Sequence, residues 1–192
     1  MPHRPPAGSE ADGQGGRPRG LLRRLFPVVL AIAIALAALA PAAIALLALV
    51  RPAAAAETCA PGTVSLRWDG GSARFSVEIA DTADERARGL MFRETMPRSA
   101  GMLFVYPTPQ PAAFWMRNTL IPLDILFFDQ TGTLTVAHPE AVPGDETPLP
   151  GGDAVSLVLE INGGLAERIG IPLGAQLQNP AVDAALAAWP CR

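Results

Sequence analysis

The sequence predicts a mainly β domain, a compact sandwich or barrel-like (jelly-roll-like) fold with one or two short helices. Apolar and polar residues alternate in several short stretches after residue 63, as they do in a strand that buries one face. Gly and Pro are abundant, with 18 and 20 residues, and they separate these stretches with turn signals. Many short strands with frequent turns favour a β-sandwich or a barrel.

The first predicted elements are a β-hairpin and a short helix. Residues 64–68 and 75–79 alternate in polarity on either side of a Gly-containing turn, which predicts two antiparallel strands. Thr82 is followed three residues later by Glu, the spacing of a capping box, and Gly89 can end the helix that this box begins.

The rest of the chain is expected to form short strands between turns. The segment containing Asp124 is otherwise apolar on both faces, which is typical of a central strand. A Pro- and Gly-rich loop is expected over 139–152 and a second short helix over 165–169. The extended segments predicted after residue 97 are 102–106, 112–117, 123–129, 133–137 and 155–161.

The N-terminal part has the pattern of an export signal. A basic region over residues 1–24, expected to be disordered, precedes an apolar segment over 25–56 that is a signal peptide or a membrane anchor. Residues 25–50 lack charged side chains and are long enough to span a bilayer, which favours an anchor. Small residues before Glu57 instead favour cleavage after Ala56.

Both outcomes predict a single exported domain over residues 57–192, periplasmic or extracytoplasmic. The membrane is then contacted only through the N-terminal segment, and only if that segment stays uncleaved. The pair Arg23 and Arg24 leaves the Sec and twin-arginine routes both open.

The charge of the predicted domain bears on its partners. From residue 57 onward the chain has 9 Arg against 16 Asp and Glu, a net charge of −7. An acidic surface repels phosphate backbones, so we expect no nucleic-acid partner. The remaining partner classes are a small ligand or a component of the envelope.

The two cysteines lie at opposite ends of the predicted domain. Cys59 is near its start and Cys191 is the penultimate residue. In an oxidising compartment such a pair is most simply a disulfide that joins the two ends, with two free thiols as the alternative.

Several motifs resemble one known family. Trp-Met-Arg-Asn-Thr at 115–119 is followed by Ile-Pro-Leu-Asp at 121–124, and 85–91, 101–104 and 159–161 add to the likeness. Over a core of about residues 64–178, the chain resembles the bacterial and archaeal family named domain of unknown function 192, in an exported variety. The resemblance implies a compact, mainly β fold. It brings no established activity and therefore no catalytic residue.

The best candidate binding site lies between Phe114 and Asp124. Trp115 offers a stacking platform, and a guanidinium, an amide and a carboxylate accompany it around a tight turn. On this hypothesis the polar anchors are Arg117, Asn118 and Asp124. The simpler interpretation is structural, with Asp124 paired to Arg117 or Asn118 in a hydrogen-bonded brace, because an unpaired buried carboxylate is costly.

Glu160 and His138 are weaker candidates. Glu160 lies in an apolar strand, where its pKa should be perturbed unless Arg86 or Arg88 pairs with it. His138 could join methionines in a Cu(I) site, but methionines spaced among leucines and phenylalanines favour core packing, so we expect no metal and no cofactor. The methionines are Met91, Met96, Met102 and Met116.

Three functions remain open from the sequence. The leading hypothesis is a non-enzymatic envelope protein whose β domain binds a small molecule, a glycan or a peptide segment, or serves as an accessory domain. The second is an enzyme that uses Asp124 or Glu160 as acid or base with loop carboxylates, and the third is a purely structural interaction domain. The loop carboxylates are Glu140, Asp145, Glu146 and Asp153.

Overall fold

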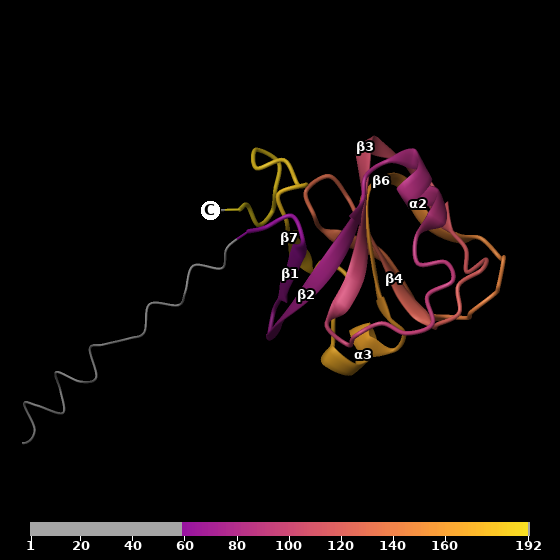
Figure 1. Ribbon diagram of the computed structural model, residues 1–192. Helices are drawn as coiled ribbons and strands as arrows, with labels where there is room; N and C mark the ends of the chain where they lie inside the picture. The colour runs from indigo at the N-terminus through magenta and orange to yellow at the C-terminus, as the bar shows by residue number, and fades with distance from the viewer. Residues whose placement is uncertain (1–58, 192) are drawn as a thin grey trace, which may run out of the picture. The chain divides into compact units, whose positions relative to one another are not determined.

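The computed structural model describes residues 59–191 and contains seven strands and two short helices (Figure 1). The predictions for 1–24 and 25–56, including cleavage after Ala56, lie outside the described residues. The elements are β1 (Thr63–Trp68), β2 (Gly71–Ala80), α2 (Ala83–Arg88), β3 (Ala100–Phe114), β4 (Leu123–Phe128), β5 (Leu134–Ala141), β6 (Leu149–Asn162), α3 (Leu165–Ile169) and β7 (Gln176–Gln178).

All seven strands belong to one sheet, in the order β5-β4-β6-β3-β2-β1-β7. Neighbouring strands are antiparallel except β2 and β3, which are parallel. A parallel pair needs a crossover connection, and here the segment containing α2 provides it. The sheet is strongly curved (Figure 1). The prediction of a mainly β, barrel-like fold with one or two short helices is therefore confirmed.

The central strands are buried on both faces. Along β4 the residues alternate between two hydrophobic clusters, with Leu126 and Phe128 in one and Leu123, Ile125 and Phe127 in the other. The first cluster, the α3-face cluster, also contains buried residues of α3 and β1. The second, the α2-face cluster, is continued by residues of β3 and of the segment that follows α2. Each helix is thus associated with a different face of the sheet.

The local sequence signals correctly predicted the hairpin and both helices. Thr82 caps α2, and its hydroxyl accepts from the Glu85 backbone N–H while the Glu85 carboxylate accepts from the backbone N–H of Thr82. The capping box is therefore formed, and Gly89 ends the helix as expected. The helix predicted over 165–169 is α3, with the same bounds.

The structure corrects the prediction for residues 100–114. The two short segments predicted there, around 102–106 and 112–117, are parts of one strand, β3, which ends at Phe114. Its prolines, Pro107, Pro109 and Pro111, are not among the residues that pair with β6, and the register shifts in this stretch. Proline lacks a backbone donor and is tolerated where the ladder needs none.

The loop predicted over 139–152 is also shorter than expected. Strand β5 continues to Ala141 and β6 begins at Leu149. Gly151 on β6 packs directly on the Phe127 ring, so a Cβ at this position would overlap the ring. The strand β7 was not predicted.

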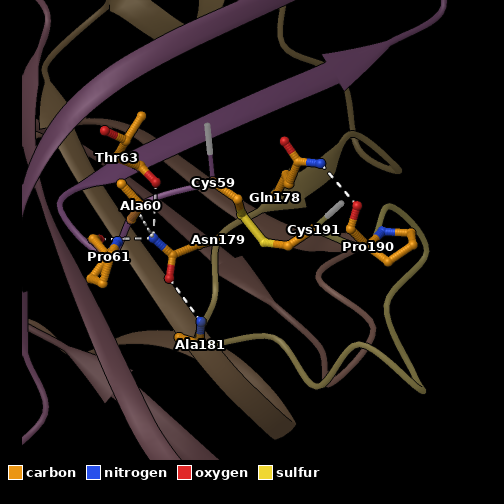
Figure 2. The surroundings of a disulfide bond; sticks show 9 residues. All are labelled: Cys59, Ala60, Pro61, Thr63, Gln178, Asn179, Ala181, Pro190 and Cys191. Atoms are coloured by element: carbon orange, nitrogen blue, oxygen red, sulfur yellow. Dashed lines mark hydrogen bonds between the residues drawn. A yellow bond between two sulfur atoms is a disulfide. The ribbon is translucent and has the colours of Figure 1, made fainter. Parts of the chain in front are cut away.

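A disulfide joins the two ends of the described chain (Figure 2). Cys59 and Cys191 are bonded, with their Cα atoms 5.6 Å apart. Nearby, the Asn179 amide donates to the carbonyl oxygens of Pro61 and Thr63, each at 2.9 Å. The amide of Gln178 donates to the carbonyl oxygen of Pro190 at 2.9 Å. Polar contacts therefore support the covalent bond at this corner of the domain.

Residues 59–191 include no helix long and apolar enough to cross a membrane.

Candidate binding cavity

Asp124 is fully buried and its carboxylate is held by three backbone N–H groups. Oδ1 accepts from Glu140 and Gly164, each at 2.8 Å, and Oδ2 accepts from Ala166 at 2.7 Å. Gly164 is the N-cap of α3 and Ala166 lies in its first turn, so the carboxylate also satisfies the N-terminus of this helix. The hydrogen bonds of Asp124 come from the backbone, whereas the expected brace used Arg117 or Asn118.

The other residues of the predicted Trp115 site lie in the loop after β3. Trp115 is 46 % exposed, and the Arg117 guanidinium carbon lies 5.5 Å from its ring centroid. Asn118 has a positive φ of 56°, and its carbonyl oxygen accepts from the Phe92 backbone N–H at 2.8 Å. This loop is therefore fixed to the segment that follows α2.

His138 and the methionines do not form a common cluster. The His138 ring nitrogen Nε2 lies 2.9 Å from the Pro150 carbonyl oxygen, and the ring packs edge-on against Phe127. Met102 and Met116 are buried members of the α2-face cluster, and Met96 packs against it. Among residues 59–191 no group of three or more His, Cys, Asp and Glu side chains could hold a metal ion.

A cavity of about 210 Å³ opens between α2, β3, the Trp115 loop and the end of β6. Its walls combine aromatic with charged and polar side chains, and Phe104 and Phe114 meet edge-to-face with centroids 4.9 Å apart. The other lining residues used below are Arg86, Ala87, Arg88, Tyr106, Trp115 and Glu160. We call this space the Trp115 cavity.

Glu160 is the buried acid of the Trp115 cavity. It is only 4 % exposed, and its Oε2 atom has no hydrogen-bond partner among the described residues. Its cross-strand neighbours are Met102 on β3 and Ile125 on β4, both apolar. Burial without a partner disfavours the charged form and raises the pKa of Glu160 to about 8.

Arg86 and Tyr106 form a second polar group in the cavity wall. The Arg86 guanidinium donates to the Val105 carbonyl oxygen at 3.0 Å and to that of Asp81, and lies over the Tyr106 ring at 5.2 Å. Burial raises the pKa of Tyr106, the Arg86 charge opposes this, and the Glu160 carboxyl adds to the rise. Arg86 is thus held by backbone carbonyls, although it shares the cavity with Glu160.

The structure therefore brings together residues that the sequence assigned to different sites, and Arg86, Arg88 and Met91 line the same cavity. Trp115 and Glu160 line one cavity, although they were proposed for different sites. Asp124 belongs to the opposite face, because the residue opposite it in β6 is Ile161, a member of the α3-face cluster. Sequence reasoning missed Tyr106, which directly precedes the Pro-rich stretch 107–111 and gives no local signal of its role.

The loop carboxylates have local roles. Glu140 contributes its backbone N–H to Asp124, and Asp145 accepts from the Thr147 backbone N–H at 2.9 Å. The hydrogen bond from the Thr147 backbone N–H is the main reason that the pKa of Asp145 lies below its usual value. Glu140, Asp145, Glu146 and Asp153 are exposed and none lines the Trp115 cavity.

Two solved structures resemble this chain. One is a protein of unknown function from Novosphingobium aromaticivorans DSM 12444, with 45 % identity and a TM-score of 0.59, over 60 % of this chain and 83 % of that one. The other is a putative transcription regulator from Sinorhizobium meliloti 1021, with 35 % identity and a TM-score of 0.61, over 65 % of this chain and 97 % of that one. No curated protein matches the chain.

The match to a family model confirms the resemblance seen in the motifs. It covers residues 64–179, which include every strand except the first residue of β1. The family is described only as an uncharacterized group of conserved proteins. The chain belongs to this family, the domain of unknown function 192.

Proposed function

We propose that this protein is an exported envelope protein whose β domain binds a small molecule in the Trp115 cavity. The observation that carries the proposal is the unpartnered Glu160 Oε2 in the wall of an aromatic cavity. A buried polar atom normally has a partner, and a bound ligand would supply one. Aromatic side chains together with convergent polar groups are typical of small-molecule sites.

Support for export comes from the two ends of the chain. The apolar segment over 25–56 has the pattern of a signal peptide or an anchor. The bond between Cys59 and Cys191 is of a kind that persists in oxidising compartments and is rare in the cytosol.

A role in nucleic-acid binding has little support. One similar structure is described as a putative transcription regulator. From residue 57 onward, however, this chain has a net charge of −7, and such a surface repels phosphate backbones.

The test is native mass spectrometry of the full chain purified from the envelope of the cells that make it. We expect a small molecule that stays bound under native conditions and is released on denaturation. Ala87→Phe should abolish the bound mass, because Ala87 lies on α2 and lines the cavity. Ala83→Phe is the matched control, since Ala83 is exposed on the same helix and does not line the cavity.

A bound mass that survives Ala87→Phe would place the ligand elsewhere and contradict the proposal. A wild-type protein that carries no ligand, and that binds none from a metabolite extract, would leave the structural interpretation as the better one.

Acid–base catalysis by Glu160 is the second candidate function. A carboxyl group that keeps its proton near neutral pH can donate it to a bound substrate. If this is the function, the recovered ligand should be converted by the wild type and left unchanged by Glu160→Gln. Unchanged ligand with both proteins would exclude it.

A further inference from the structure

We infer that the ligand of the Trp115 cavity is a small zwitterion, with an ammonium group at Glu160 and a carboxylate at Arg88. This inference rests on the proposed binding function and adds the chemical class of the ligand. It uses three features of the cavity, which are its floor, its walls and its mouth.

The floor of the cavity lacks a positive charge that could pair with Glu160. The strand neighbours of Glu160 are apolar, and no described residue forms an ion pair or a hydrogen bond with its Oε2 atom. Arg86 shares the cavity but donates to the carbonyl oxygens of Asp81 and Val105. A ligand cation that reaches Glu160 would gain a charge-assisted hydrogen bond in a site of low dielectric.

The walls are suited to an organic cation. Four aromatic rings line the cavity, those of Phe104, Tyr106, Phe114 and Trp115. The faces of aromatic rings attract cations, and a carboxylate with aromatic rings is a recurrent way to bind ammonium groups. The same rings cover the carbon chain of the ligand and exclude water from it.

The mouth of the cavity carries positive charge, whereas its floor carries the acid Glu160. Arg88 is exposed on α2, lines the cavity and has no hydrogen-bond or ion-pair partner among residues 59–191. Arg117 lies nearby over the Trp115 ring. These two guanidinium groups repel a simple cation and attract a carboxylate, which favours a ligand that carries both charges.

The size of the cavity limits the ligand. Its volume of about 210 Å³ lies below the range of roughly 300–1,000 Å³ that is typical of sites for drug-sized molecules. An amino acid with a short carbon chain fits within this volume, whereas a nucleotide or an oligosaccharide would extend out of it.

Binding of an ammonium group should displace a proton. Burial raises the pKa of Glu160 to about 8, so at pH 7 the carboxyl is mostly protonated in the free protein. A bound ammonium group favours the carboxylate and lowers this pKa. One proton should therefore leave Glu160 for each ligand bound, and the affinity should rise as the pH increases from 6 towards 8.

The experiment is isothermal titration calorimetry of the purified full chain with ω-amino acids from glycine to 6-aminohexanoate. Each is compared with the amine and the carboxylate of equal length, such as butylamine and butyrate for 4-aminobutyrate. Titrations at pH 7 in two buffers with different ionisation enthalpies give the number of protons released.

We expect at least one amino acid to bind tenfold more tightly than its matched amine and carboxylate, with release of nearly one proton. Its affinity should increase about tenfold from pH 6 to pH 7, in the range where Glu160 must be deprotonated for binding. The proton count needs no variant, so it tests the inference even if a substitution at Glu160 impairs folding.

Two variants and their controls test the two ends of the ligand. Glu160→Gln should abolish proton release and weaken binding at least tenfold, while Glu167→Gln on the exposed face of α3 should change neither. Arg88→Gln should weaken binding of the amino acid but not that of the matched amine, which loses a repulsive charge. Arg168→Gln, at a second exposed arginine, is its control.

The possible failures are distinguishable. If the natural ligand is neutral or purely anionic, or if butyrate binds as well as 4-aminobutyrate without proton release, the inference is wrong and the proposed binding function stands. If native mass spectrometry finds no ligand and no probe binds, both are wrong.

Discussion

Asp124 and Glu160 are both buried acids of adjacent strands, but their side chains have different surroundings. Asp124 accepts three backbone hydrogen bonds on the α3 face, and these bonds fully explain its burial. Glu160 lies on the α2 face with an oxygen that no described group satisfies. The sequence marks both as acids in apolar strands, and only the structure separates a structural role from a candidate functional one.

This difference could not be read from the sequence for a physical reason. The partners of Asp124 are backbone groups at residues 140, 164 and 166, and a backbone N–H carries no signature of residue type. The aromatic pattern around Trp115 was visible, but its proximity to Glu160 depends on how β3 and β6 pair. Residue types therefore singled out Trp115 and Glu160 as candidates, but the sequence could not show that the two line one cavity.

Glu160 should make the stability of the protein depend on pH. Its pKa is raised from the ordinary value of 4.5 to about 8 in the folded state, so the folded protein holds a proton that the unfolded chain releases between these values. The free energy of unfolding should fall as the pH rises through this window, by up to roughly 1.4 kcal/mol per pH unit from this group, and level off above pH 8.

Urea denaturation at a series of pH values measures this dependence. Glu160→Gln should flatten the profile between pH 5 and pH 8 and raise the free energy of unfolding at pH 8, whereas Glu167→Gln should leave the profile as in the wild type. Identical slopes for the wild type and Glu160→Gln would show that Glu160 titrates normally in the folded protein.

At the scale of elements, short-range signals were sufficient for the hairpin and for both helices. A capping box and a following glycine act within one helical turn, so α2 could be located from Thr82 to Gly89. The full length of strand β3 could not be predicted from the sequence, because three prolines suggested breaks in it. Its continuity depends on β6, a distant partner whose register shifts leave those prolines outside the ladder.

Gly151 shows how closely β6 packs on β4. We expect Gly151→Ala to destabilise the protein by about 1–3 kcal/mol, because the new methyl group overlaps the ring of the fully buried Phe127. Chemical denaturation measures the change.

Gly62→Ala, at the residue before β1, is the control substitution. The nearest atom to its new Cβ is the Val77 carbonyl oxygen at 3.6 Å, an ordinary contact, so the stability should change little. Equal stabilities of the two variants would mean that the β4–β6 packing is looser than the structure indicates.

At the scale of the whole molecule, the fold class followed from alternation and turn signals, whereas the order of the strands did not. The sheet places β7, the last described strand, beside β1, the first. No local sequence pattern encodes this pairing. The disulfide prediction needed only the positions of two cysteines in the sequence, and the structure joins them (Figure 2).

Reduction of the disulfide should destabilise the whole domain. The bond closes a loop with a sequence separation of 132 residues, and in the chain-entropy model such a crosslink contributes about 4–5 kcal/mol. The urea midpoint should therefore fall when a thiol reductant is added to the wild type.

A variant with both Cys59→Ser and Cys191→Ser is the control, since it should have the lower midpoint with or without reductant. A wild-type midpoint that the reductant does not change, with both thiols shown to be reduced, would mean that the closed loop contributes nothing to stability.

The location of Cys191 also constrains how the molecule is made. Because it follows β7 in the chain, its thiol emerges from the ribosome after every described strand has been synthesised. A nascent or truncated polypeptide that lacks residue 191 therefore cannot form this bond, and its formation shows that synthesis has passed residue 191.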